Sequence, residues 1–338
     1  MAVPALNVIR NNYPDAHITL LLSGGGKAGC TGLLNNSGLV DEFLEYNISG
    51  NIIKRLFKIF GLMLILRRKR FDLLIYLRRN QRDFSRFKIR DQKIFKSCGI
   101  KKILGCSIDC TLPSAGSPEC YKKYPTHAQL LLERLNADGI VSPGKLNFDL
   151  HLTAEELDAG EVFARRLKEI SGEKIPVAFG LGGSRQVQFY PAEKWCAVLT
   201  ELEKSSVFPL FFGGAKDECA VRAMLQKVQN GCWYGDIMPL NLRETVAAMS
   251  KCRCYIGHDT GTMHMAVAAG IPCVAVFSSV ACRGVWDPET PKSIVLRTEN
   301  LSCRSCELTK CTYGDPAKCI DAIEPSEVVD AVKRLLGL

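Results

Sequence analysis

The stretch Tyr255–Phe277, YIGHDTGTMHMAVAAGIPCVAVF, constrains the fold of this chain more than any other. It starts with a short apolar run and passes through the polar residues 257–261. It then becomes rich in Ala and Met, until Gly270 and Pro272 interrupt it before a second apolar run at Cys273–Phe277. This order predicts a strand, a turn, a helix and a strand, which together form a βαβ unit. The turn of such a unit lies at the edge where an open parallel sheet binds ligands.

The polar turn allows two interpretations. A helix that opens Thr-Gly-Thr at 260–262 leaves backbone N–H groups without helical partners, and a diphosphate suits such groups. Asp259 and Thr260 are also common N-cap residues, which need no ligand. His264, one turn into the helix, is placed to face either a ligand or the core. The turn by itself therefore predicts a phosphate site and an ordinary capped helix equally well.

Length and charge favour two α/β domains with different partners. At 338 residues the chain is long enough for two domains with ample cores. Apolar strand-like runs alternate with helical patterns, which predicts doubly wound parallel sheets. Residues 1–150 carry 23 Lys+Arg against 12 Asp+Glu, net +11, and the rest carry 21 against 23, net −2, giving the +9 of the whole chain. We expect a basic domain at 1–152, with an anionic partner, and a neutral one at 153–338.

The basic residues are densest at 51–102, which holds 17 Lys and Arg and 3 acidic residues. At 51–70 they accompany apolar residues at helical spacing, namely Ile52, Ile53, Leu56, Phe57, Phe60, Leu64 and Ile65. The commoner arrangement for one such helix is a solvated basic face around a buried apolar stripe. The size of the excess instead favours an anionic partner. We expect a membrane surface rather than nucleic acid, because no nucleic-acid recognition motif or aromatic stacking platform accompanies these residues.

Hydropathy and cysteine content bear on the compartment. No run approaches the ~20 uncharged apolar residues of a membrane helix, and no signal peptide is evident. Sixteen cysteines without an export signal argue for a reducing cytosol and mostly free thiols. We therefore expect a cytoplasmic protein that is peripheral to the inner face of the cytoplasmic membrane.

The full pattern over 259–272, D-T-G-T-M-H-x-A-x-A-x-G-x-P, resembles the signature of glycosyltransferase family 9, the bacterial ADP-heptose:lipopolysaccharide heptosyltransferases. The resemblance implies a GT-B architecture, in which two Rossmann-like domains with doubly wound parallel sheets face each other across a cleft. The first domain would bind the acceptor and the second the donor. It also implies inverting transfer of heptose, or a related sugar, from ADP-heptose to lipopolysaccharide inner core, with no cofactor required. A family member with another donor or acceptor, and a non-catalytic nucleotide-sugar-binding protein, are the alternatives.

The same resemblance implies a set of residues that hold the donor's phosphates. They are Asp259, Thr260, Gly261, Thr262 and His264 in the turn and its helix, and Ser184, Arg185 and Gln188 in the loop after an earlier strand. Gln188 stands where family members commonly carry a Lys that contacts the phosphate. Positive charge is therefore expected from Arg185 or Lys194, unless the donor differs.

The resemblance further implies contacts with the nucleoside. Leu240 matches the position that packs on the adenine, and Asp217 or Glu218 the acidic position near the ribose. Leu240 is otherwise an ordinary core residue and Glu218 the solvated start of a helix.

The family's general base is expected outside the chain as given. The Asp of a Gly-Asp motif, the proposed base, lies six residues before a Pro that matches Pro4, so it would fall before Met1. We therefore expect the first strand of the acceptor domain and its base to precede Met1, and the chain as given to be weak or inactive.

Four cysteines close to the C-terminus have the spacing C-x2-C-x4-C-x7-C. They are Cys303, Cys306, Cys311 and Cys319. The first pair has metal-ligand spacing, so a structural zinc site is one interpretation. A loop of free or oxidisable thiols is the other.

Overall fold

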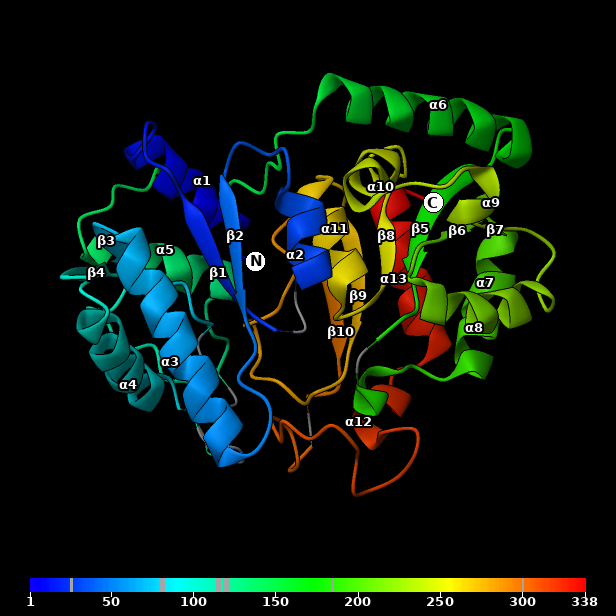
Figure 1. The fold of residues 1–338 in the computed structure, drawn as a ribbon. Helices are drawn as coiled ribbons and strands as arrows, with labels where there is room; N and C mark the ends of the chain where they lie inside the picture. The colour runs from blue at the N-terminus through cyan, green and yellow to red at the C-terminus, as the bar shows by residue number, and fades with distance from the viewer. Residues whose placement is uncertain are drawn as a thin grey trace. The chain divides into compact units, whose positions relative to one another are not determined.

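The computed structural model divides into two compact units (Figure 1). Unit 1 comprises Met1–Ser114 and Pro125–His151, and unit 2 comprises Ala115–Tyr124 and Leu152–Leu338. The structure describes residues 1–24, 27–79, 83–113, 117, 119, 122–183, 185–299 and 301–338.

The strands of unit 1 form two parallel pairs. β1 (Thr19–Ser23) pairs with β2 (Glu42–Tyr46), and β3 (Leu73–Ile75) pairs with β4 (Lys102–Leu104). The described strands of this unit do not join into a single sheet, so the doubly wound sheet expected here is present as two separate pairs. Apolar patterning could not reveal the split, because it reports burial and not which strands pair.

Helices surround these strand pairs. They are α1 (Val3–Asn12), α2 (Lys27–Leu34), α3 (Ile52–Lys69), α4 (Phe84–Ser97) and α5 (His127–Ala137). Helices α1 and α5 pack against each other and bury Ala5, Val8, Leu131 and Leu135 in one apolar cluster.

Helix α3 departs from the arrangement expected of a single amphipathic helix. The seven apolar residues at helical spacing are all exposed, so they form no buried stripe. A second apolar row faces inward instead: Leu66 is buried and Ile59, Leu62 and Met63 are half-buried. Helical spacing predicted the helix correctly, but the chain supplies apolar residues for two faces and only one of them is covered.

Unit 2 contains a six-stranded parallel sheet in the order β10-β9-β8-β5-β6-β7. The strands are β5 (Ile175–Gly180), β6 (Val207–Phe211), β7 (Cys232–Trp233), β8 (Tyr255–His258), β9 (Cys273–Phe277) and β10 (Ile294–Arg297). From β5 the chain builds outward through β6 and β7, and from β8 it builds the other way through β9 and β10. The sheet therefore reverses its direction of winding between β5 and β8, which is where open α/β sheets bind ligands.

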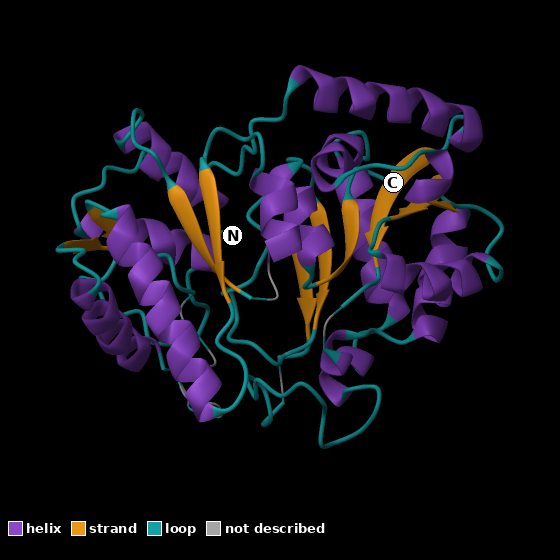
Figure 2. Cartoon of the chain, viewed as in Figure 1, coloured by secondary structure: helices purple, strands orange, loops and turns teal. Residues whose placement is uncertain are grey.

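Helices cover both faces of this sheet (Figure 2). They are α6 (Ala154–Ser171), α7 (Ala192–Glu203), α8 (Ala215–Leu225), α9 (Tyr234–Ile237), α10 (Leu242–Met249), α11 (Gly261–Ala268), α12 (Lys318–Asp321) and α13 (Pro325–Leu336). Helices α7 and α13 pack together against the sheet, while α10 packs on α6 and α11. Strands β6, β8 and β9 are buried along their whole length, as expected of a parallel sheet covered on both faces.

Two contacts fix the helices that precede the site. A capping box begins α6: the Thr153 hydroxyl accepts from the Glu156 amide, and the Glu156 carboxylate accepts from the Thr153 amide. The same carboxylate receives two hydrogen bonds from Arg243, at 2.6 and 2.9 Å, and this buried pair ties α6 to α10.

Among the described residues, none of the helices combines the length and apolar character needed to cross a membrane.

Candidate functional site

A cavity of about 310 Å³ lies at the carboxyl ends of β5, β6 and β8. Three loops line it: Gly182 and Gly183 after β5, residues 212–214 with 216 and 217 after β6, and Asp259–Thr262 after β8. Tyr234, Leu242, Thr245 and Met265 complete the wall. The cavity thus occupies the ligand-binding edge that the βαβ pattern predicts.

The first turn of α11 opens on this cavity without a side-chain cap. Thr260 is the N-cap residue and is extended, with φ −143° and ψ 175°, but its side chain makes no capping hydrogen bond to the described helix. Its hydroxyl lies 2.9 Å from that of Thr262, which lies 2.9 Å from the Tyr255 hydroxyl. This geometry favours a ligand site over an ordinary capped helix, because the Thr260 hydroxyl does not accept a hydrogen bond from the amides of the helix, which leaves those amides open to a ligand.

Close backbone approach brings the central strands together beneath the turn. Gly257 lies opposite Gly180 in the register of β8 and β5. A Cβ at Gly257 would fall 2.3 Å from the Gly180 carbonyl oxygen and 2.4 Å from the Tyr255 hydroxyl. Only glycine leaves room for the tyrosine to cross here, so the Tyr255 hydroxyl can reach the first turn of α11.

Asp259 is a half-buried carboxylate beside that turn, with 14% of its side chain exposed. Its backbone oxygen and its Oδ2 lie 3.2 and 3.4 Å from the Gln188 side-chain amide, and its Oδ1 lies 3.9 Å from His264 Nε2. Burial raises the pKa of Asp259 to about 6, against the lowering effects of Arg185 and Arg297. Gln188 therefore holds the carboxylate that precedes the turn, and it does not itself line the cavity.

His258 supports the site from inside the sheet. Its buried Nε2 accepts from the Tyr190 amide at 3.1 Å and from Trp195 Nε1 at 3.3 Å. Nδ1 then carries the proton and donates to the Gly182 carbonyl oxygen at 3.3 Å. Burial lowers the pKa of His258 to about 4, so the ring is neutral near pH 7. The expected turn at 257–261 is partly wrong, because β8 continues through His258 and buries it.

The acidic position predicted near the ribose has two occupants with different surroundings. Asp217, in the first turn of α8, lines the cavity, and its Oδ2 accepts from the Gly214 amide at 2.9 Å. A Cβ on Gly182 would fall 2.6 Å from the same oxygen, so the two loops meet at this carboxylate. Glu218 instead pairs with Arg222, at 2.8 Å, on the exposed side of α8.

Of the remaining residues predicted to bind the donor, none of those described lines the cavity. Half-buried Leu240 does not line the cavity, whereas Leu242 does. Lys194 donates to the carbonyl oxygens of Asp321 and Ile323, so the expectation that it supplies charge to the phosphates is wrong. Ser184 lies outside the described residues.

Two cations near the site were not predicted from the sequence. Lys216 lines the cavity, and its Nζ donates to the Gly183 carbonyl oxygen at 3.3 Å. Arg297, at the end of β10, is buried and lies 3.4 Å from Asp287, while its Nε and Nη1 lack hydrogen-bond partners in the described structure. Neither residue belongs to a motif, and only the fold brings them near Asp259.

A further pocket of about 290 Å³ is lined by the four cysteines predicted as candidate zinc ligands. Each of these four cysteines is a free thiol. No three His, Cys, Asp or Glu side chains in the described part of the chain are placed to hold a metal ion. The geometry of these thiols therefore gives the zinc interpretation no support.

Comparison with known proteins relates this architecture to one family. Residues 127–315 match the model of glycosyltransferase family 9 (heptosyltransferase). No curated protein matches the sequence. A family 9 glycosyl transferase structure from Veillonella parvula matches with a TM-score of 0.67 at 19% identity, covering 99% of this chain and 92% of that one.

Two Escherichia coli structures are also similar. ADP-heptose lps heptosyltransferase II has a TM-score of 0.63 at 16% identity, with 99% of this chain and 94% of that one covered. Heptosyltransferase WaaC, solved with ADP, has a TM-score of 0.55 at 13% identity, with 99% and 92% covered. At these identities the likeness shows the fold, and it confirms the α/β class with parallel sheets, of the GT-B kind, that the sequence predicts.

Proposed function

Because the chain belongs to glycosyltransferase family 9, the heptosyltransferase family, it is a glycosyltransferase, and we propose that it transfers heptose or a related sugar from ADP-heptose to lipopolysaccharide inner core with inversion. The single observation that carries the donor proposal is the uncapped first turn of α11, open to a cavity at the switch point of the sheet. A similar structure, that of Escherichia coli WaaC, contains ADP, which supports a nucleoside diphosphate as the occupant.

The diphosphate would lie against the start of α11. The amides of Gly261 and Thr262 and the hydroxyls of Thr260 and Thr262 are the donors within reach, and the positive end of the helix dipole favours an anion. Lys216 would add positive charge from the opposite loop. Donors held in place before the reaction stabilise the charge that develops on the departing diphosphate, which is how this site would accelerate transfer.

The nucleoside would lie between α8 and α10. Tyr234 stacks on Phe212, with ring centroids 5.3 Å apart, and both line the cavity together with Leu242. These side chains offer the apolar surface that a purine needs. Asp217 uses Oδ2 for the Gly214 amide, and Oδ1, which has no partner among the described residues, would accept a ribose hydroxyl.

The partners follow from the two halves of the chain. We propose that residues 153–338 bind the donor and that residues 1–152 bind the glycolipid acceptor. The basic excess of the first half favours a phosphorylated acceptor and peripheral association with the inner face of the cytoplasmic membrane. No cofactor enters this scheme.

Calorimetric titration with ADP tests the donor site, and product detection with ADP-heptose and an inner-core acceptor tests transfer. We expect ADP to bind with one-to-one stoichiometry and binding to weaken when Thr262 is replaced by Val, which removes the hydroxyl and keeps the shape. A chain that fails to bind ADP would refute the donor assignment. Transfer from another nucleotide sugar but not from ADP-heptose would refute the proposed donor sugar and leave the diphosphate site standing.

A further inference from the structure

Helix α3 presents an apolar face that no described residue of unit 1 covers. Its exposed residues range from 76% accessible at Ile52 to 40% at Leu64, and Phe57 and Phe60 lie between them at 74% and 60%. Ile53, Phe57, Phe60 and Leu64 follow one another at helical spacing, so they share one side of the helix. The inward row ending at Leu66 already anchors α3, so the exposed row is not needed for folding.

The charge around this face has one sign. Seven basic residues and no acidic residue lie between Tyr46 and Phe71. Lys69 pairs with Glu42 at 2.6 Å, which occupies one of them. Arg67, Arg68 and Arg70 form no ion pair with any described carboxylate, so their charge remains available to a partner.

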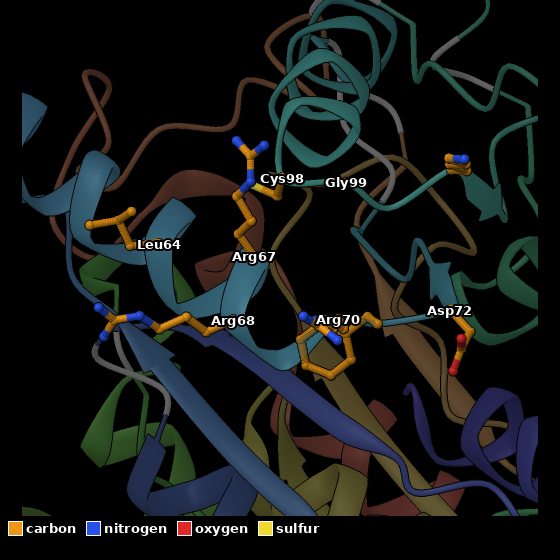
Figure 3. A pocket seen from close by; sticks show the side chains of 9 residues that line it. Leu64, Arg67, Arg68, Arg70, Asp72, Cys98 and Gly99 are labelled. Carbon is orange, nitrogen blue, oxygen red and sulfur yellow. The ribbon is translucent and has the colours of Figure 1, made fainter.

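A pocket of about 740 Å³ opens where the apolar face ends (Figure 3). Leu64 belongs to both, and the pocket's cations are Arg67, Arg68, Arg70 and Lys101, against the single carboxylate of Asp72. Figure 3 shows Arg67 reaching toward Cys98 at the end of α4, while Arg68 and Arg70 project from the end of α3. Apolar surface thus continues directly into an anion-attracting pocket.

We propose that α3 and this pocket form a docking surface for an anionic lipid bilayer. The helix lies in the plane of the interface, with Phe57 and Phe60 among the acyl chains and the arginines of the pocket against lipid phosphates. This inference deepens the proposed membrane association by naming the surface responsible, and it is independent of the donor and of the sugar transferred.

Charge and shape select the bilayer over other occupants. A second copy of the chain would bring two basic surfaces together, which repel each other. Nucleic acid would match the arginines but would leave Ile53, Phe57 and Phe60 in water. An interfacial helix needs both features, namely large apolar side chains on one side and Lys or Arg beside them. Helix α3 is not apolar enough to cross the membrane, so it lies on it.

Vesicle binding of the full chain tests the proposal. Phosphatidylcholine vesicles with and without phosphatidylglycerol are sedimented with the wild type, with the double variant Phe57→Ser/Phe60→Ser and with the double variant Arg67→Gln/Arg68→Gln. We expect tight binding only to the anionic vesicles. The affinity should fall by roughly tenfold or more without the phenylalanines and by about fivefold for each arginine lost.

Matched controls come from unit 2. Leu157→Ser/Ile170→Ser removes two exposed apolar side chains of α6, and Lys227→Gln/Arg253→Gln removes two exposed charges. Both should bind vesicles as the wild type does. All variants should keep the wild-type unfolding midpoint and ADP affinity, which separates failure of this surface from failure of the donor site.

A spectroscopic readout locates the contact directly. Phe57→Trp should show a blue-shifted fluorescence increment on adding anionic vesicles, and Leu157→Trp should not. Inorganic phosphate at constant ionic strength should not displace the bound protein, since the surface recognises a bilayer and not a free ion. The proposal is overturned if the wild type ignores anionic vesicles, if the α6 variant loses as much binding as the α3 variant, if the indole introduced by Phe57→Trp stays in water, or if free phosphate competes.

Discussion

The replacement Gly261→Pro removes one hydrogen-bond donor from the proposed diphosphate site and leaves the helix able to form. Gly261 is the first residue of α11, where proline is well tolerated because the N–H it lacks has no helical partner. The residue before a proline must be extended, and Thr260 already is, with φ −143° and ψ 175°. Nothing lies within 4 Å of a Cβ placed at Gly261, so the ring has room at its base.

The size of the effect follows from the charge of the ligand. A hydrogen bond to a charged group contributes about 1.5–3 kcal/mol. Losing one to a diphosphate should therefore raise the Kd for ADP by roughly 10- to 150-fold. The free energy of unfolding, measured in the absence of ligand, should change little, because no amide in the interior of the helix loses its hydrogen-bond partner.

Calorimetric titration with ADP measures the change, and Gly261→Ala is the matched control. Alanine adds the same Cβ to the wall of the cavity but keeps the N–H, so the ratio of the two dissociation constants isolates the amide. If the proline and alanine variants bind ADP equally well, the Gly261 amide does not hold the diphosphate, and the reasoning from the open helix start is refuted.

Three further predictions concern buried groups near the site. Because the pKa of Asp259 is raised to about 6 in the folded chain, folding takes up a proton between about pH 4 and 6, and the free energy of unfolding falls as the pH rises through that window. In urea unfolding, the free energy of unfolding of Asp259→Asn relative to the wild type should therefore rise by about 3 kcal/mol between pH 4 and 7. If that relative free energy stays constant over this pH range, the raised pKa of Asp259 is contradicted. His258→Leu leaves the Tyr190 and Trp195 donors buried without their acceptor and should lower the free energy of unfolding by roughly 3 kcal/mol; wild-type stability would show that those hydrogen bonds contribute little. Glu156→Gln leaves Arg243 as an uncompensated buried charge and should cost roughly 3–5 kcal/mol in the same assay, with exposed Glu169→Gln as the neutral comparison.

Prediction from the sequence works best for the part of the site that one continuous stretch of chain forms. Strand, turn, helix and strand over 255–277 require only local patterning, and the structure has each of them. His258 was misassigned to the turn, because a polar residue after an apolar run usually ends a strand. Its burial depends on Tyr190 and Trp195, which lie 68 and 63 residues away in the sequence. No local pattern reports such distant partners.

Contacts between residues that are distant in the sequence also explain why two cations near the site were not predicted. Lys216 and Arg297 come near Asp259 only because β6, β8 and β10 end at the same edge of one sheet. Lys194 has the right charge but points toward α12 and α13, away from the cavity. In α3, helical spacing shows which residues share a side but not which side is covered. Periodicity constrains the elements, and their packing decides what the elements can bind.

The neighbouring strands β5 and β8 are far apart along the chain: Tyr255 reaches the carbonyl of a residue 75 positions earlier. No partly folded chain that lacks β8 can therefore hold the nucleotide, however complete β5, β6 and β7 have become. Ligand would stabilise only the finished domain, so it should slow unfolding and leave the rate of folding almost unchanged. A nucleotide added during refolding would then bind only after the last step of folding, and it would not accelerate any earlier step.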